Sequence, residues 1–494
     1  MLKYLAVLVL CCKIFNASTQ EPLVTEFRGV WITTVSNLDW PSSPYLPINK
    51  QKEEFKEILD FYQSLNFNAV IVQVRTMSDA CYPSDVVPFS KFLSGKEGYR
   101  GVWEEEDPMV FMIDEAKKRD LEFHAWFNPF RSHGNNIINK NKDWIVDYGN
   151  KFYLNPGIPD VRKHIIAVLK EFLDKYEVAG IHFDDYFYPY RKEGFFYDDT
   201  SAFIDFSKGF EDRESWRRAN IDSLIKEAGH LIHQVNPSIQ FGVSPFGVWR
   251  NIEDDPQGSL TRAEQTTYDD LYANPMVWIE NKWIDYLAPQ LYWSYYFDKA
   301  PYHNLVNWWN KNADEIPIYS GNAIYKVNTN FDLNWKDPDE IYRQLTLNRS
   351  LKNVKGHIFF RARSLMERHE LAFQIAEDLH KHPVLPRSVI KGKTEFEPPK
   401  IKAIKIRKKT IFVDLDNSDI TENIKVLVLD NDKNTEHRII YKEDIHSLPC
   451  LSFQLIGDKM EVELVFIDQF NQISMPSRVV GAKKNQNEWE VYSP

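Results

Sequence analysis

Short apolar runs alternate with longer amphipathic stretches through roughly the first 380 residues of the chain. Runs rich in β-branched and aromatic residues, which are typical of buried strands, lie at 26–35, 68–75, 122–131, 179–185, 239–246, 284–293, 317–325 and 356–362. Between them, apolar positions recur at helical spacing, at 50–65, 107–119, 161–176, 215–235, 305–314, 338–351 and 370–381. Eight strands alternating with helices predict an α/β fold, a (β/α)8 barrel of the TIM type. The competing fold, an open doubly wound sheet, usually carries a Gly-rich phosphate turn after an early strand, and the sequence has none there.

The pattern changes after residue 382, where prolines stand at 383, 386, 398 and 399. Short strand patterns joined by Asn- and Asp-rich turns follow at 401–405, 410–414, 424–429, 438–441 and 461–468. They predict a small all-β sandwich of the immunoglobulin or fibronectin type. The expected domains are a barrel over 21–385, a linker over 386–398 and a sandwich over 399–494. We expect the sandwich to pack against the barrel, with glycan or partner binding as the alternative.

The first twenty residues have the pattern of a targeting segment. Lys3 precedes an apolar run over 5–10 that is too short to span a bilayer. Cys11 and Cys12 directly after the run suggest a lipoprotein signal, whereas residues 17–19 suggest an ordinary cleavage region. Both alternatives predict export, to the periplasm, the outer membrane or the cell surface, and the first adds a lipid anchor.

Composition narrows the classes of partner. The net charge of −11 argues against nucleic acid as the main partner. Aromatic residues make up 14% of the chain, and Trp and Tyr are the side chains that stack on the apolar faces of sugar rings. Only Cys81 and Cys450 remain beyond the targeting segment, in different expected domains, so neither a disulfide framework nor a cysteine-based metal site is expected.

The fourth strand pattern carries the strongest candidate chemistry. In a barrel the active site lies at the C-terminal ends of the strands, and side chains alternate between the two faces of a strand. Gly180, His182 and Asp184 therefore share the inward face, while Asp185 lies at the rim. These two adjacent carboxylates are the leading candidates for catalysis, with a helix cap or a rim salt bridge as the structural alternative.

Other strand ends carry polar or aromatic residues that could bind substrate. Alternation puts Gln73 and Arg75 on one face of the second strand, with Asp79 in the loop that follows. Arg75 is expected either to hold a neighbouring carboxylate ionised or to form a barrel-lining ion pair. The remaining candidates for substrate binding are Arg28, Trp31, His124, Trp126, Asn128, His182, Tyr186, Gln290, Tyr292 and Trp293.

These parts suit hydrolysis of a glycosidic bond, which commonly needs two carboxyl groups. Asp184 is the expected nucleophile or base. The acid stays open between Glu253, which is favoured, and Asp185, while the loop after the fourth strand also offers residues 198 and 199. Metal catalysis through His124 and His182 is the weaker alternative, because the first strand lacks the His-x-His of barrel amidohydrolases. No metal and no cofactor are expected.

Five separated motifs resemble the glycosyl-hydrolase-like 10 family, in the same order, across residues 25–380. They lie at 27–32, 72–82, 124–131, 180–189 and 288–293. The family includes bacterial envelope proteins, among them a divisome-localised glycosidase that cuts peptidoglycan glycan strands lacking stem peptides. The resemblance therefore implies a periplasmic or surface glycosidase acting on amino-sugar polymers.

The family is also distantly similar to α-amylase- and α-galactosidase-type barrels. In these barrels a Gly, a basic residue and an Asp at two-residue steps place the nucleophile last, as Gly180, His182 and Asp184 do here. The fifth strand departs from that pattern because no acidic residue ends it.

Two alternatives to an enzyme stay open at this point. One is a glycan-binding barrel that has lost hydrolysis, and the other is surface adhesion through the sandwich.

Overall fold

A computed structural model describes residues 25–132, 140–386 and eight strands between residues 400 and 492. The predicted targeting segment and nearly all of the predicted linker lie outside the described residues. Within the described part of the chain, none of the helices has both the length and the apolar character needed to cross a bilayer.

Eight strands between residues 27 and 359 form a closed parallel barrel in the order β1-β11-β10-β9-β8-β7-β3-β2. Its strands are β1 (Phe27–Ile32), β2 (Ala69–Arg75), β3 (Glu122–Phe127), β7 (Gly180–Phe183), β8 (Gln240–Val243), β9 (Tyr286–Leu287), β10 (Ile318–Asn322) and β11 (Val354–Phe359). All eight fall within the strand patterns predicted from the sequence or overlap them. The prediction of a TIM-type barrel is therefore confirmed.

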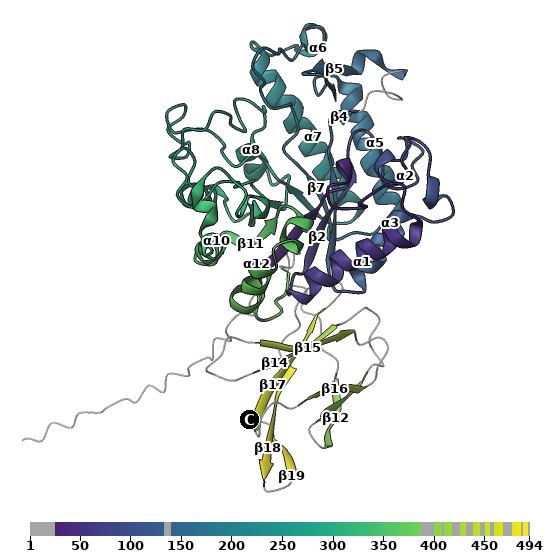
Figure 1. Ribbon diagram of the computed structural model, residues 1–494, viewed down its shortest axis with the longest axis vertical. Coiled ribbons are helices and arrows are strands. Elements are labelled where there is room, and N and C mark those ends of the chain that lie inside the picture. Colours follow the sequence, from purple (N-terminus) through teal and green to yellow (C-terminus); the bar gives the residue numbers. More distant parts are fainter. Residues whose placement is uncertain are drawn as a thin grey trace, which may run out of the picture.

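Helices cover the outside of the barrel, and each barrel strand is followed by at least one helix (Figure 1). The helices are α1 (Ile48–Ser64), α2 (Lys91–Ser94), α3 (Pro108–Lys117), α5 (Pro159–Lys175), α6 (Thr200–Phe206), α7 (Arg213–Val235), α8 (Pro275–Glu280), α9 (Tyr302–Asn312), α10 (Glu340–Arg349), α11 (Ala362–Met366) and α12 (His369–Gln374). Local sequence explains how some of them begin. Asp107 caps α3 by accepting from the Met109 amide at 2.8 Å, and Pro108 occupies the first helical position.

Large rings fill the interior of the barrel. Phe27 stacks on Tyr319 with ring centroids 4.1 Å apart, and Tyr286 lies beside them. Glycines make room for these rings on neighbouring strands: a Cβ on Gly242 would lie 1.9 Å from the Tyr286 ring, and one on Gly180 would lie 2.2 Å from His124 Nδ1. The interior is thus a packed core that forms a floor beneath the C-terminal mouth.

The loop after β3 forms a small sheet that the strand prediction missed. It consists of β4 (Arg131–Ser132), β5 (Ile145–Tyr148) and β6 (Lys151–Leu154), in the order β4-β6-β5. Gly149 and Asn150, both with positive φ, form the two-residue turn between β5 and β6. A Gly-Asn pair between aromatic runs is a hairpin signal that the sequence did carry.

The C-terminal strands form two antiparallel sheets, in the orders β12-β13-β16 and β15-β14-β17-β18-β19. Their bounds are β12 (Lys400–Arg407), β13 (Thr410–Asp416), β14 (Lys425–Asp430), β15 (Arg438–Asp444), β16 (Cys450–Gln454), β17 (Lys459–Ile467), β18 (Ser477–Asn485) and β19 (Glu488–Tyr492). The all-β character agrees with the sequence, and the sandwich of immunoglobulin or fibronectin type stays a prediction.

Candidate active site

Asp184 and Asp185 follow β7 directly, at the C-terminal mouth of the barrel, and are 3% and 1% exposed. Asn128, after the adjacent strand β3, donates its amide to Asp184 Oδ2, and the Tyr186 backbone amide lies 3.3 Å from Oδ1. The Tyr190 hydroxyl donates to Asp185 Oδ2. The structure therefore brings both carboxylates together in a nearly dry environment.

This environment raises the pKa of both carboxyl groups. Burial and the neighbouring charge of Asp185 raise the pKa of Asp184 to about 7, against the opposing effect of the Arg131 guanidinium. Burial also raises the pKa of Asp185, with Tyr190 and Gln290 favouring its ionised form. Two adjacent buried carboxylates resist double ionisation, so the pair can hold one proton near neutral pH.

Aromatic side chains and one arginine surround the carboxylates. The Arg131 guanidinium lies 3.5 Å from the centroid of the Tyr186 ring, and Tyr186 contacts Tyr190 edge to face. On the other side Tyr292 stacks on Phe360 with centroids 5.7 Å apart. Burial raises the pKa of Tyr292, and the negative charges of Asp184 and Asp185 raise it further.

Trp293 and Gln290 also lie near the carboxylate pair, and Gln290 hydrogen-bonds to Asp185. Trp293 packs edge to face on Phe246 at 5.4 Å, and Phe246 in turn contacts Tyr190. Arg131 and Phe360 were not among the predicted site residues. Arg131 could have been found, because it ends the motif at 124–131, whereas Phe360 lies in an apolar strand pattern where an aromatic residue is ordinarily part of the core.

His124, His182, Trp31 and Trp126 form the floor below the carboxylates. The Tyr286 hydroxyl lies 3.0 Å from Nδ1 of both histidines, and His182 Nε2 is within 3.3 Å of Trp31 Nε1 and 3.0 Å of Ser244 Oγ. Burial and the neighbouring His124 lower the pKa of His182, so its ring is neutral. The inward direction of His182 that strand alternation predicted is confirmed, and both histidines lie fully buried beneath the mouth.

Gln73 lies at the mouth, but Arg75 does not share its face. The ladder between β2 and β3 shifts by one residue there: Gln73 pairs with Trp126, and Arg75 pairs with Phe127. This irregularity inverts the alternation, so the guanidinium lies 3.4 Å from the Asp79 carbonyl oxygen and 3.5 Å from that of Pro129. The expectation of a shared face is wrong for this physical reason.

Asp79 and Arg28 lie away from the carboxylate pair. Asp79 accepts from the backbone amides of Thr76 and Met77 and so stabilises its own turn. Arg28 lies near the start of β1, at the opposite end of the barrel, where its Nε is 2.8 Å from Glu26. Contacts at the N-terminal face of a barrel ordinarily stabilise the fold and do not bind substrate.

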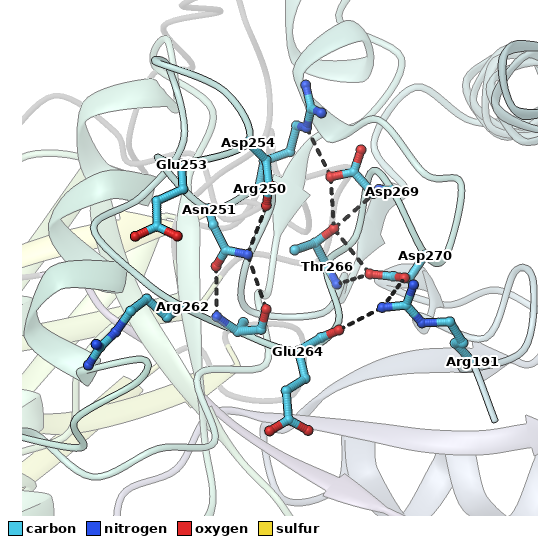
Figure 2. A pocket seen from close by; sticks show the side chains of 11 residues that line it. Arg191, Arg250, Asn251, Glu253, Asp254, Arg262, Glu264, Thr266, Asp269 and Asp270 are labelled. Carbon is cyan, nitrogen blue, oxygen red and sulfur yellow. Dashed lines mark hydrogen bonds and ion pairs between the residues drawn. The ribbon is translucent and has the colours of Figure 1, made fainter. Parts of the chain in front are cut away.

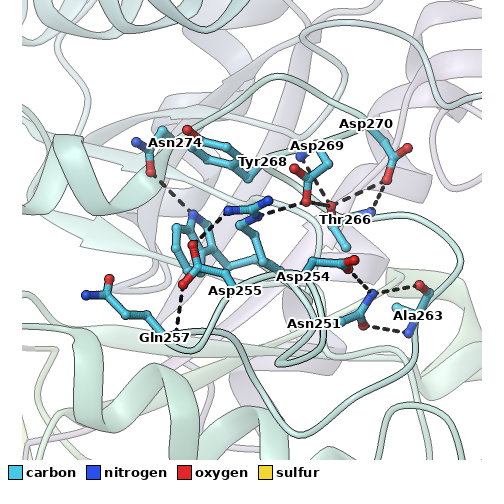
Figure 3. Close-up of polar contacts among 12 residues, drawn as sticks. Asn251, Asp254, Asp255, Gln257, Ala263, Thr266, Tyr268, Asp269, Asp270 and Asn274 are labelled. Atoms are coloured by element: carbon cyan, nitrogen blue, oxygen red, sulfur yellow. Dashed lines mark hydrogen bonds and ion pairs between the residues drawn. The ribbon is translucent and has the colours of Figure 1, made fainter. Parts of the chain in front are cut away.

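Glu253 lies in the loop after β8, which lines a polar cavity of about 500 Å³ together with Arg191 (Figure 2). Glu253 is exposed, and the residues lining this cavity do not include Asn128, Asp184 or Asp185. Asn251 holds the loop by pairing with the backbone of Ala263 and with Asp254 (Figure 3). The structure does not bring Glu253 to the carboxylate pair.

The other acidic residues considered for the acid are also elsewhere. Asp198 is exposed, and Asp199 forms a two-pronged ion pair with Arg217 at 2.7 Å. Asp185 is therefore the carboxylate that the structure offers as the partner of Asp184.

Known proteins match this chain over most of the barrel. The family model described as glycosyl hydrolase-like 10 matches residues 26–337. Glycosyl hydrolase YngK of Bacillus subtilis (strain 168) is 42% identical over 386 residues, which cover 75% of this chain and 74% of that protein. Glycosyl hydrolase DigH of Escherichia coli (strain K12) is 35% identical over 385 residues, which cover 70% of this chain and 86% of that protein.

A solved structure agrees with the fold. The PgaB (BpsB) glycoside hydrolase domain from Bordetella bronchiseptica superposes with a TM-score of 0.50 at 14% identity, covering 71% of this chain and 98% of that domain. At this identity the likeness supports the barrel fold alone. The family match and the two sequence relatives carry the assignment, and this chain therefore belongs to the glycosyl hydrolase-like 10 family of glycoside hydrolases.

Proposed function

We propose that this protein is an exported glycosidase that hydrolyses O-glycosidic bonds of bacterial cell-wall glycan, with strands lacking stem peptides as the substrate. The observation that carries the proposal is the buried pair Asp184 and Asp185 at the mouth of the barrel. Unpaired burial of carboxylates is costly, and groups with raised pKa values gather at catalytic sites. The choice of cell-wall glycan, and export with or without a lipid anchor, rest on the sequence motifs.

Asp184 and Asp185 have different roles in this proposal. A nucleophile must be ionised, whereas burial raises the pKa of Asp184 to about 7. We therefore assign Asp184 as the group that exchanges a proton, and Asp185 as the ionised partner that stabilises positive charge on the sugar ring. The bond from the anomeric carbon to the leaving oxygen breaks, and the leaving oxygen takes the proton from Asp184. Water then bonds to the anomeric carbon and gives one proton to the Asp184 carboxylate, which restores the protonated acid.

The aromatic walls suit the bound sugar. Tyr186, Tyr292 and Trp293 are half-buried beside the pair and can stack on a pyranose ring, while Arg131 and Gln290 can donate to its hydroxyl groups.

The test measures turnover on defined glycans. Purified protein is incubated with glycan strands stripped of stem peptides, with chitin oligomers and with α- and β-glucans, and products are separated by chromatography. Only the stripped strands, and to a lesser degree chitin oligomers, should be shortened. Asp184→Asn and Asp185→Asn should each lower kcat by about 10²–10⁴-fold.

A matched control is Asp198→Asn, since Asp198 is exposed and accepts from the Thr200 amide at the start of α6. This variant should retain the parent rate. Binding of every glycan without shortening of any would favour the non-catalytic glycan-binding barrel. Equal turnover in Asp184→Asn and the parent would remove the assignment of Asp184.

A further inference from the structure

Two side chains, Gln73 and Asn128, connect the backbone that follows the first barrel strand to Asp184. The backbone amides of Thr34 and Val35 donate to Gln73 Oε1 at 3.1 and 2.9 Å. Gln73 Nε2 then donates to Asn128 Oδ1 at 2.6 Å, and Asn128 Nδ2 donates to Asp184 Oδ2. The contacts therefore run along the mouth across the neighbouring strands β1, β2, β3 and β7.

The direction of these hydrogen bonds is determined at their first member. A backbone amide can only donate, so the carbonyl oxygen of Gln73 must face Thr34 and Val35. Its NH2 group must then face Asn128, which in turn must present its own NH2 group to Asp184. Gln73 and Asn128 are both fully buried, so water cannot replace either partner.

Resting on the proposed role of Asp184, we propose that Gln73 and Asn128 are positioning residues that determine which oxygen of Asp184 carries its proton. Oδ2 accepts the hydrogen bond of the Asn128 amide, whereas Oδ1 has only the longer contact of 3.3 Å from the Tyr186 backbone amide, so a proton on Asp184 is favoured on Oδ1. The hydrogen bonds from Gln73 to Asn128 and from Asn128 to Asp184 thus leave Oδ1 as the oxygen that exchanges a proton with the substrate. Neither Gln73 nor Asn128 needs to touch the sugar for this role.

Apart from the Tyr186 backbone amide, which lies 3.3 Å from Oδ1, the other groups around Asp184 affect its charge without selecting an oxygen. Asp185 opposes its ionisation, and Arg131 favours it. The ring of Tyr186 lies beside the pair, and Tyr292 approaches from the loop after β9. Tyr190 acts on Asp185 through its hydroxyl group. None of these groups lies in the sequence of hydrogen bonds that leads through Gln73.

Gln73→Glu reverses the direction of the hydrogen bonds between residue 73, Asn128 and Asp184, while the side chain of residue 73 keeps almost the same shape. One oxygen of the introduced carboxylate can still accept from Thr34 and Val35, but its other oxygen can only accept as well. Asn128 must then turn its NH2 group to residue 73 and its oxygen to Asp184. Two oxygens face each other unless Oδ2 is protonated, so the affinity of Asp184 for its proton must rise.

The experiment follows the protonated carboxyl band of Asp184 by infrared spectroscopy, with isotope-labelled aspartate in the full chain. Asp184→Asn identifies the band by its loss. In Gln73→Glu the band should persist to a pH at least one unit higher than in the parent, a tenfold rise in proton affinity. Where turnover is measurable, the corresponding inflection of kcat/KM against pH should move by the same amount.

Gln73→Met separates orientation from charge. It removes the amide without adding a negative charge and frees Asn128 to turn, so the band should shift in the same direction by a smaller amount. Gln51→Glu is the control, because Gln51 is a fully buried glutamine of α1 that donates to backbone carbonyls outside the mouth. In Gln51→Glu the Asp184 carboxyl band should disappear at the same pH as in the parent.

The outcomes separate the inference from the proposed function. The inference is overturned if the Asp184 band of Gln73→Glu disappears at the same pH as in the parent. It is also overturned if that pH rises in Gln73→Glu but not in Gln73→Met, because the rise would then be an effect of charge alone. The infrared titration needs no substrate, so it gives its answer even if no glycan is cleaved. A failure of glycan cleavage overturns only the proposed function.

Discussion

Asp184 occupies a position where a carboxylate is costly to ionise, and this has a consequence for stability. Its pKa in the folded chain is raised to about 7, above the value of 3.8 for a free aspartate. A group with a raised folded pKa binds its proton more tightly in the folded state. Its contribution to stability is therefore fully present below about pH 4 and is lost as the pH rises through 7.

Asp184→Asn removes this dependence. The variant should gain stability relative to the parent as the pH rises from 5 to 8. The gain is about 1.4 kcal/mol for each pH unit up to about pH 7, where the parent group is protonated in the folded state and ionised in the unfolded state. Thermal unfolding of both proteins at the two pH values measures the change. Asp198→Asn, at an exposed carboxylate, serves as the comparison. A difference between Asp184→Asn and the parent that stays constant with pH contradicts the prediction.

At the level of single residues, the sequence predicted the direction of some barrel side chains correctly and of others wrongly. Strand alternation was sufficient for His182, because β7 pairs regularly with both neighbours. It was not sufficient for Arg75, because the irregular pairing of β2 with β3 depends on contacts between strands. The role of Gln73 and Asn128 toward Asp184 could not be predicted either, since it depends on which strands become neighbours around the barrel.

At the level of elements, Glu26 joins β1 to α10 at the N-terminal face. Its carboxylate accepts from Arg28 at 2.8 Å and from two nitrogens of Arg349 at 2.9 Å. Burial alone would raise the pKa of Glu26, but these guanidinium groups outweigh it and lower the pKa to about 2. The Glu26 carboxylate therefore stays ionised, and the ion pairs stay intact, from neutral pH down to about pH 2.

Glu26→Gln should destabilise the protein because it leaves two guanidinium groups without their carboxylate. We expect a loss of about 3 kcal/mol in the free energy of unfolding, measured by denaturant titration, and an unchanged kcat/KM below the transition. Glu53→Gln is the control, since Glu53 pairs with Lys50 on the exposed side of α1. Equal effects of the two substitutions, or a selective loss of turnover in Glu26→Gln, would contradict this assignment.

Periodicity predicted the eight barrel strands because each lies in or overlaps a largely apolar run of the sequence and is buried in the structure. It missed β4, β5 and β6 because their apolar runs are only two to four residues long, too short for a strand pattern to be read from periodicity. Their turn at Gly149 and Asn150 was a better signal than their composition. The loops at the mouth are therefore the part of the fold that sequence pattern predicts least.

At the scale of the whole molecule, the barrel closes without any strand from the C-terminal sheets. β1 pairs with β11, and the Glu26 amide donates to the Leu385 carbonyl at 3.0 Å. Deletion of residues 395–494 should therefore leave a folded barrel that cleaves glycan at the rate of the full chain. Circular dichroism and the glycan assay test this, and loss of turnover from a folded barrel would assign the C-terminal sheets a part in catalysis.

Closure of the barrel also brings residues 25 and 385 into one β-bridge at the base. Anything joined to either end of the barrel is thereby attached on the side away from Asp184. Under the proposal of an N-terminal lipid anchor, the anchored segment would join the barrel at this base, away from the mouth. Such a geometry suits an enzyme that must reach long polymers from a fixed point, because polymer can enter the mouth without passing the tether.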